Sequence, residues 1–275
     1  MKRVLVTGCS GYIGSHLCDM LVKNGYHVDG MDKKMPKVSV RTFYLSDITS
    51  RLDVQHEYDC VVHLAALVRV GEAETRPLDY FLTNVSGTSN VLGSIRTKNF
   101  VFASTGAAEG SPGIYGKTKQ IAEGLVQDFN KKIKDVDFTI FRFYNVIGSD
   151  GYPPTNPDGL FYKLLESKDT GKFTIYGIDY NTKDGTCIRD YVHVNEICSS
   201  ILEAIETPSN SIECLGHGTG YSVKEIADIF QEVNNCHIQI DVGPRRDGDQ
   251  ESSVLNSVSP YMKNLYSIEE LLRIK

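Results

Sequence analysis

The stretch RVLVTGCSGYIGSHL, residues 3–17, decides the fold of this chain, because three glycines join a β-rich run to a helical pattern. The first glycine permits a tight turn, the second lets a pyrophosphate approach the backbone, and the third lets the helix pack closely on the strand. The helix N-terminus then presents free N–H groups and its positive dipole end to phosphates. A glycine-rich turn without a ligand is the alternative, but the strand-loop-helix context favours a dinucleotide site. That site would comprise Gly8, Gly11, Tyr12, Ile13 and Gly14.

Strand-like and helix-like runs alternate through the first half of the chain. β-rich runs occur at residues 2–7, 27–31, 41–45, 60–65, 100–104 and 138–143, and helical patterns follow the first run, cover 78–96 and precede the last run. Alternation with short loops predicts an α/β fold, a Rossmann-type doubly wound parallel sheet with right-handed crossovers.

After about residue 145 the regular alternation of strand-like and helix-like runs ends. Residues 151–159 are rich in Pro, Gly and Asn and are expected to form a loop that leads into a less regular region. We expect residues 1–145 to form a dinucleotide-binding Rossmann domain. A later segment, at about residues 186–218, is expected to be part of the same domain. Residues 146–275 would form mainly a smaller α/β substrate-binding domain. Ser222 with Glu225, and Ser267 with Glu270, have the spacing of capping boxes and predict two helix starts there.

Composition and charge exclude several classes of protein. Apolar residues make up 41% of the chain and charged residues 23%, so a packed core is expected. The net charge of −6 argues against general nucleic-acid binding, and no apolar run approaches the roughly 18 residues of a membrane helix. Seven scattered cysteines without a CxxC pair, and no close histidine spacing, predict a cytoplasmic protein with no metal site and no disulfide framework.

Asp32 ends the second strand-like run, 18 residues after Gly14. An acid at this place accepts hydrogen bonds from both ribose hydroxyls and repels a 2′-phosphate, so NAD is favoured over NADP. Lys33 and Lys34 follow directly and leave NADP open, because a lysine could hold that phosphate.

Tyr115 and Lys119 are spaced i and i+4, which places both side chains on one helix face. A free tyrosine has a pKa near 10, and a lysine ammonium together with a positive nicotinamide ring would lower it toward the working range. The spacing is common by chance, but this helix follows the fifth strand, whose carboxyl end carries Ser104 and Thr105. Open α/β sheets hold their active sites at that edge, so Ser104, Thr105, Tyr115 and Lys119 are the candidate catalytic residues.

With these features together, the chain resembles the extended short-chain dehydrogenase/reductase family, and within it the UDP-glucose 4-epimerases. The resemblance runs nearly the whole length, through HLAALVRVGE (63–72), RPLDYFLTNVSGT (76–88), FRFYNVIG (141–148), GTGYSV (218–223) and PRRDGD (244–249). Its most specific part is DGTCIRDYVHV (184–194). The resemblance implies NAD-dependent epimerisation at C4 of a UDP-hexose through a 4-keto intermediate.

The resemblance also implies roles for individual residues. On the cofactor side, Asp47 and Ile48 would contact adenine, and Ala65, Ala66 and Arg69 would line the groove. Asn84 would lie near the nicotinamide half, and Phe143 and Tyr144 would lie beside the cofactor. On the substrate side, Asn145, Arg189 and Arg246 would bind the diphosphate. Leu160 and Tyr176 would lie on either side of uracil, and Asp249 would contact the ribose. His63 and His193 lie inside strand-like runs and are expected to be packed core residues.

Departures from the family pattern keep several alternatives open. Tyr115 follows Thr105 by only ten positions, the segment between Met31 and Val40 is brief, and Ser253 occupies a gate where the family often has an aromatic. The small Ser253 could admit an N-acetylated sugar, so an N-acetylhexosamine 4-epimerase is one alternative. Others are a 4,6-dehydratase, an NADP-dependent reductase and a silent NAD-binding module. The dehydratase is disfavoured because Thr105 is followed by GAA instead of an Asp-Glu pair. A homodimer would also match the family.

Overall fold

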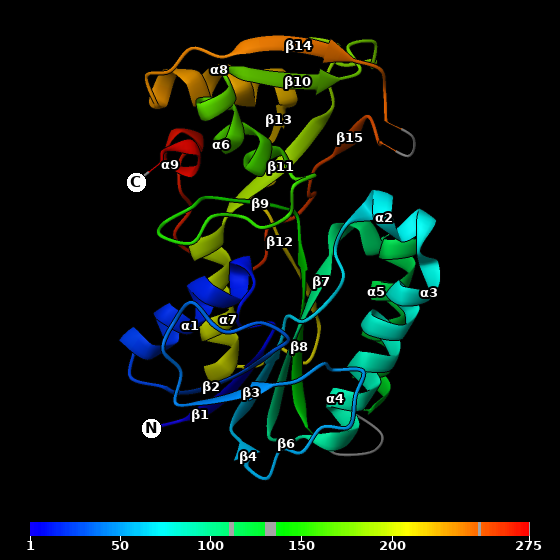
Figure 1. The fold of residues 1–275 in the computed structure, drawn as a ribbon, viewed down its shortest axis with the longest axis vertical. Coiled ribbons are helices and arrows are strands. Elements are labelled where there is room, and N and C mark those ends of the chain that lie inside the picture. Colours follow the sequence, from blue (N-terminus) through cyan, green and yellow to red (C-terminus); the bar gives the residue numbers. More distant parts are fainter. Residues whose placement is uncertain (110–112, 130–135, 247–248, 275) are drawn as a thin grey trace. The chain divides into compact units, whose positions relative to one another are not determined.

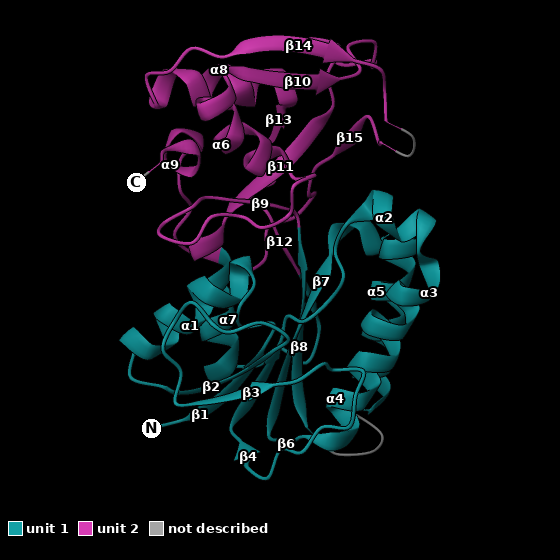
Figure 2. Ribbon diagram, in the orientation of Figure 1, with its two compact units in different colours: residues 1–143, 197–213 teal, residues 144–196, 214–275 magenta. Residues whose placement is uncertain are grey.

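The computed structural model describes residues 1–109, 113–129, 136–246 and 249–274. The chain divides into two compact units (Figure 2), unit 1 with residues 1–143 and 197–213, and unit 2 with residues 144–196 and 214–275. The segment that returns to unit 1 is shorter than the expected 186–218, because residues 188–193 pair with strands of unit 2.

Unit 1 is built on a seven-stranded sheet with the order β12-β8-β7-β5-β1-β2-β3 (Figure 1). From β8 to β3 every neighbouring pair runs parallel. The bounds are β1 (Arg3–Thr7), β2 (His27–Asp32), β3 (Thr42–Leu45), β5 (Cys60–His63), β7 (Asn99–Thr105), β8 (Asp137–Phe143) and β12 (Ile212–Leu215). The expected Rossmann-type sheet is therefore confirmed. The strand order reverses between β1 and β5, and ligands of such sheets bind at that crevice.

Helices cover both faces of this sheet, with α1 (Tyr12–Lys23) and α7 (Val194–Glu206) on one side (Figure 1). The other side carries α2 (Val70–Thr75), α3 (Pro77–Tyr80), η1 (Phe81–Gly87), α4 (Thr88–Ser94) and α5 (Ile114–Phe129). The helix expected over 78–96 is present, but its middle part, η1, is a π-helix that the sequence did not predict. A short parallel pair, β4 (Glu57–Tyr58) with β6 (Arg96–Thr97), and a 3₁₀ turn, η2 (Gly106–Ala108), complete the unit.

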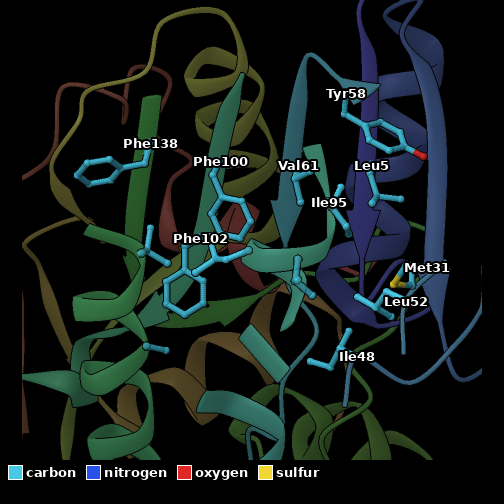
Figure 3. Packing of buried hydrophobic residues seen from close by; sticks show 14 of the residues in the cluster. Leu5, Met31, Ile48, Leu52, Tyr58, Val61, Ile95, Phe100, Phe102 and Phe138 are labelled. Carbon is cyan, nitrogen blue, oxygen red and sulfur yellow. The ribbon is translucent and has the colours of Figure 1, made fainter. Parts of the chain in front are cut away.

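The core of unit 1 lies between the sheet and the helices α4 and α5. Figure 3 shows Val61, Phe100 and Phe102 on the central strands and Ile95 at the end of α4, all of them buried. Ala122 and Val126 of α5 join the same cluster. This packing fixes α5, the helix with Tyr115 and Lys119, against the strand that ends at Thr105.

The described residues of unit 2 form two small sheets and three helices. In one sheet β11 (Ile188–His193) pairs antiparallel with β13 (Gly220–Ser222) and parallel with β15 (Ser252–Ser253) and β9 (Asn145–Ile147). In the other, β10 (Lys172–Tyr176) and β14 (Gln239–Gly243) run parallel. The helices are α6 (Leu160–Thr170), α8 (Val223–Val233) and α9 (Ile268–Leu272), and both predicted capping boxes are present at the starts of α8 and α9.

No helix in the described residues is both long and apolar enough to cross a membrane. The described residues also contain no group of three or more His, Cys, Asp or Glu side chains able to hold a metal ion.

Candidate active site

The glycine loop after β1 has the geometry that its spacing predicts. Gly8 has φ +75°, and a Cβ placed on it would lie 2.7 Å from the Ala65 nitrogen. A Cβ on Gly14 would lie 2.1 Å from the Gly8 oxygen, so only glycine allows α1 to start this close to the loop. Gly11 precedes Tyr12 and Ile13 as the N-cap of α1 and offers no side chain to the first N–H groups. These N–H groups are the donors that an anion needs at a helix N-terminus.

Asp32 is held beside this loop at the end of β2. One of its carboxylate oxygens accepts the Ser10 N–H at 3.0 Å, and the other accepts the Lys34 N–H at 3.1 Å. Each oxygen keeps a further acceptor position, as two ribose hydroxyls require. The ammonium of Lys33 pairs with Asp47 at 3.3 Å, so this lysine is committed to a carboxylate and less available to a 2′-phosphate.

Asp47 and Ile48 lie in the turn after β3. The Asp47 carboxylate accepts the Thr49 N–H and hydroxyl, both at 2.9 Å. Burial opposes ionisation of Asp47, but the hydrogen bonds from Thr49 and Lys33 outweigh it and lower its pKa. The Ile48 side chain is buried against Gly87, so its side chain belongs to the core.

The segment after β5 runs directly beside the glycine loop. The Ala65 N–H donates to the Thr7 hydroxyl at 3.3 Å, and Ala66 follows it half-buried. Further along, the Arg69 N–H donates to the Tyr80 hydroxyl, which itself donates to the Arg69 carbonyl at 2.7 Å. Tyr80 is fully buried and fixes the backbone of this segment.

A chain of buried hydrogen bonds links the glycine loop to η1. The Thr88 hydroxyl donates its single proton to the Asn84 carbonyl at 2.7 Å. In the 3.0 Å bond between His63 Nε2 and the Thr88 hydroxyl, His63 is therefore the donor. His63 Nδ1 then accepts from the Thr7 hydroxyl at 2.7 Å. Burial, together with the charge of Lys119, lowers the pKa of His63 to about 3. His63 is thus a neutral core residue, as expected, and His193 is equally buried.

Asn84 is fully buried and its amide is completely engaged. It accepts the Leu67 N–H at 2.8 Å and donates to the Leu67 carbonyl at 2.9 Å and to the Thr118 hydroxyl at 3.1 Å. Thr118 lies on α5 between Tyr115 and Lys119. The structure therefore places Asn84 as a link between the segment after β5 and the candidate catalytic helix.

Tyr115 and Thr105 are brought together at the carboxyl end of β7. Burial raises the pKa of Tyr115 to about 12, hydrogen bonding with the Thr105 side chain moderates the shift, and neighbouring Tyr80 adds to it. The rings of Tyr80 and Tyr115 meet edge to face with 6.4 Å between their centroids. The sequence predicts that Lys119 and a nicotinamide ring together lower this pKa; for the polypeptide alone, burial dominates and the pKa is raised.

Lys119 is 3% exposed and its ammonium lies 4.1 Å above the centre of the Phe102 ring. Burial lowers its pKa to about 7, and the charge of Glu123 partly opposes this. Lys119 is therefore poised to be partly protonated at neutral pH.

Ser104 differs from its neighbour Thr105. Its hydroxyl donates to the Glu123 carboxylate at 2.5 Å, and Glu123 also binds Arg142. The structure thus joins Ser104 to a charged cluster under α5 rather than to Tyr115. Phe143, at the end of β8, lies in register with Thr105 and is buried.

In unit 2 the structure brings several expected substrate residues together. Arg189 pairs with Asp249 at 3.7 Å, and Arg189 lies opposite Ser253 in the register of β11 with β15. The Arg246 guanidinium carbon lies 4.0 Å from the centre of the Tyr176 ring. The backbone carbonyl of Arg246 accepts the Asp249 N–H at 3.3 Å. Residues 247 and 248, inside the PRRDGD motif, lie outside the described part of the chain.

Asn145 and Leu160 occupy other parts of unit 2. Asn145 starts β9 and donates its amide to the Asp190 carbonyl at 2.9 Å, beside Arg189. Leu160 starts α6 and packs against the hydrophobic cluster of this unit. Tyr144, the first residue of unit 2, is half-buried.

Sequence reasoning missed Tyr80, Glu123 and Arg142. Glu123 follows Lys119 at i+4 on α5, which was the one local signal available for it. Arg142 approaches Glu123 only through the packing of β8 against α5, and Tyr80 reaches Tyr115 only through the packing of α3 against α5. Such contacts leave no mark in the spacing of the sequence.

Comparisons with known proteins agree with this arrangement. Residues 4–214 match the NAD dependent epimerase/dehydratase family. UDP-glucose 4-epimerase 4 of Oryza sativa subsp. japonica is 32% identical over 326 residues, covering 99% of this chain and 88% of that protein. UDP-glucose 4-epimerase of Lactobacillus helveticus is 34% identical, covering 93% and 88%.

A solved structure extends the likeness to three dimensions. UDP-glucose-4-epimerase from Stenotrophomonas maltophila, with bound NAD and formylated UDP-arabinopyranose, superposes with a TM-score of 0.86. It is 26% identical, and the match covers 99% of this chain and 96% of that one. The chain is a member of the NAD dependent epimerase/dehydratase family.

Proposed function

We propose that this chain inverts C4 of a UDP-hexose, interconverting UDP-glucose and UDP-galactose with NAD as cofactor. The observation that carries the proposal is the grouping of Thr105, Tyr115 and Lys119 in the unit that also holds the glycine loop and Asp32. The names of relatives that match over nearly the whole chain support the same reaction. Unit 1 would bind NAD and unit 2 the UDP-sugar.

The residues of unit 1 fit a dinucleotide. Side chains at Gly8 and Gly14 would fill the space where the loop meets Ala65 and α1, and the uncapped N-terminus of α1 suits a pyrophosphate. Asp32, anchored by two backbone N–H groups, is placed for the adenosine ribose. With Lys33 paired to Asp47, this end favours NAD over NADP.

What NAD supplies when bound is reversible uptake of a hydride from C4 of the sugar. Tyr115 takes the proton of the 4-hydroxyl, directly or through Thr105, and returns it at the end of the cycle. Because burial holds the pKa of Tyr115 near 12, its phenolate needs positive charge nearby. Lys119, one helical turn away on α5, supplies that charge. For inversion, the substrate site would have to let the 4-keto sugar rotate so that its other face meets the cofactor.

Two arginines of unit 2 support binding of a sugar nucleotide. Guanidinium groups suit a pyrophosphate because they donate two hydrogen bonds in a fixed plane. Arg189 and Arg246 are linked through Asp249, and Arg246 stacks on Tyr176, which provides an aromatic face beside the charges. Asn145 and Leu160 would complete the diphosphate and uracil contacts.

Ser253 favours a second candidate substrate. Ser253 pairs with Arg189 in the β11–β15 register, and a side chain this small would admit an N-acetyl group more readily than an aromatic would. The deciding experiment incubates the purified chain with UDP-glucose, UDP-galactose and their N-acetyl forms and follows the products by NMR. We expect conversion at C4, and Tyr115→Phe should slow it by about 10²-fold or more while NAD stays bound. Equal rates for Tyr115→Phe and the wild-type protein would overturn the assignment of Tyr115 as the residue that takes the 4-hydroxyl proton.

We also propose a homodimer formed through α3, η1 and α5. Leu78 is 81% exposed, Leu82 follows it at i+4, and Ile121 on the adjacent α5 is exposed as well. A second copy of the same helices would cover these apolar side chains. The seven scattered cysteines include no CxxC pair, a pattern typical of a reducing compartment, so we propose the cytoplasm.

A further inference from the structure

A buried charged cluster lies directly under the candidate catalytic helix. Glu123 of α5 receives two hydrogen bonds from Arg142 of β8, at 2.9 and 2.8 Å, and a third from the Ser104 hydroxyl. Its side chain is 3% exposed and that of Arg142 is 16% exposed. The remaining nitrogen of Arg142 pairs with Glu109 at 2.8 Å. Both oxygens of Glu123 are therefore engaged, with arginine as their cation.

Lys119 has an unusual environment beside this cluster. It precedes Glu123 by one helical turn, yet among the described residues no carboxylate lies within ion-pair distance of its ammonium. The ammonium instead lies over Phe102 of β7, a core residue shown in Figure 3. The other titratable groups around it are Tyr115 on its own helix and neutral His63 on β5. Lys119 and Glu123 are spaced i and i+4, so their side chains lie on one helix face and could form an ion pair.

We propose that Arg142 is a positioning residue that holds Glu123 away from Lys119, so that the lysine charge acts on Tyr115. The inference rests on the proposed function, since Tyr115 and Lys119 are its candidate catalytic pair. It adds that the charge state of Lys119 is controlled by residues that touch neither sugar nor dinucleotide.

Removal of Arg142 would leave Glu123 as a buried carboxylate without a cation. A buried charge without a partner is strongly disfavoured, so Glu123 would recruit the nearest cation. That cation is Lys119, whose pKa would then rise from about 7. A lysine paired to Glu123 has its charge neutralised locally, and Tyr115 would lose the group that favours its phenolate.

The test compares Arg142→Gln with the double variant Glu123→Gln/Arg142→Gln. In Arg142→Gln we expect turnover to fall roughly 10²-fold. The double variant has no stranded carboxylate and should recover most of that loss, although it lacks the same hydrogen bonds. Equal losses in the two variants would show that Arg142 acts only through packing and would overturn the proposal.

A second measurement reads Lys119 directly and does not depend on turnover. Lysine labelled with ¹³C at Cε is titrated by NMR in each variant with NAD bound, and Lys119→Met identifies the signal. In Arg142→Gln the midpoint should rise by about one pH unit or more, and in Glu123→Gln alone it should fall. A midpoint that stays fixed in both variants would overturn the proposal.

The two measurements separate this inference from the proposed function. If the wild-type chain inverts no UDP-sugar but the Lys119 midpoint moves as described, the reaction assignment fails and the role of Arg142 stands. If Arg142→Gln does not fold, Arg142→Lys takes its place, because a lysine keeps a cation beside Glu123 but cannot hold both of its oxygens in a fixed plane. The Lys119 midpoint should then still rise, and a midpoint equal to that of the wild type would overturn the proposal.

Discussion

Gly14 lies where α1 passes closest to the loop that precedes it. A Cβ at this position would lie 2.1 Å from the Gly8 oxygen and 2.8 Å from the Cys9 Cα, and neither backbone atom can yield cheaply. Gly14→Ala is therefore expected to lower the free energy of unfolding by about 2 kcal/mol or more and to abolish NAD binding. Thermal unfolding with and without NAD measures both effects.

Gly124 provides the matched control on α5. Nothing lies within 4 Å of a Cβ placed there, so Gly124→Ala should stabilise the protein by about 0.5–1 kcal/mol through its better helix propensity. A Gly14→Ala protein that unfolds like wild type and still binds NAD would contradict the close approach of loop and helix.

His63 links stability to pH. Its pKa is lowered from 6.5 to about 3 by burial and by Lys119. The unfolded chain binds a proton at this histidine below about pH 6.5, whereas the folded chain does not until about pH 3, so stability falls as the pH falls through this window. Denaturant unfolding at several pH values should show a shallower fall for His63→Gln than for wild type. Parallel curves for the two proteins would mean that His63 is not held neutral.

The π-helix η1 connects the segment after β5 to the candidate catalytic helix α5 through Asn84. Asn84 in η1 ties both backbone groups of Leu67 and the Thr118 hydroxyl of α5. Asn84→Leu leaves these buried groups without partners, and we expect a loss of about 3 kcal/mol in the free energy of unfolding. Asn90→Leu is the control, because one of its two amide hydrogen bonds is exposed and the other only part-buried, and it should cost about 1 kcal/mol. Equal costs in denaturant unfolding would argue against the linking role of Asn84.

Local patterns predicted the elements that local physics determines. The glycine spacing gave the loop between β1 and α1, and the hydroxyl-to-acid spacing gave the capping boxes of α8 and α9. The same reasoning placed Tyr115 and Lys119 on one helix after β7. These features depend on residues within one or two turns of each other.

Features that depend on packing between distant segments were not predictable in this way. Burial and the neighbouring Tyr80 raise the pKa of Tyr115 in the polypeptide alone, and the spacing of Tyr115 and Lys119 does not reveal this. Ser104 could not be distinguished from Thr105 in the sequence, since the difference is the presence of Glu123 and Arg142 beneath it. The π-helical turns of η1 likewise have no periodicity of their own in the sequence.

Exposed apolar side chains on α3, η1 and α5 of unit 1 form the proposed dimer face. If a second copy covers Leu78, Leu82 and Ile121, then Leu78→Glu/Leu82→Glu should convert a dimer into a monomer. Light scattering coupled to gel filtration measures the mass of each. Leu45→Glu, at an exposed leucine on β3, is the control and should remain dimeric. A monomeric wild-type protein would rule out the proposed face.

In the proposed reaction, C4 is inverted by removal and return of one hydride, and Tyr115 takes and returns the proton of the 4-hydroxyl. The most direct measurement uses UDP-galactose deuterated at C4 in ordinary water, with NMR of the UDP-glucose formed. We expect the deuterium to stay at C4 of the product, because the hydride is held on the enzyme and returned. Product with protium at C4, or no product at all, would contradict it.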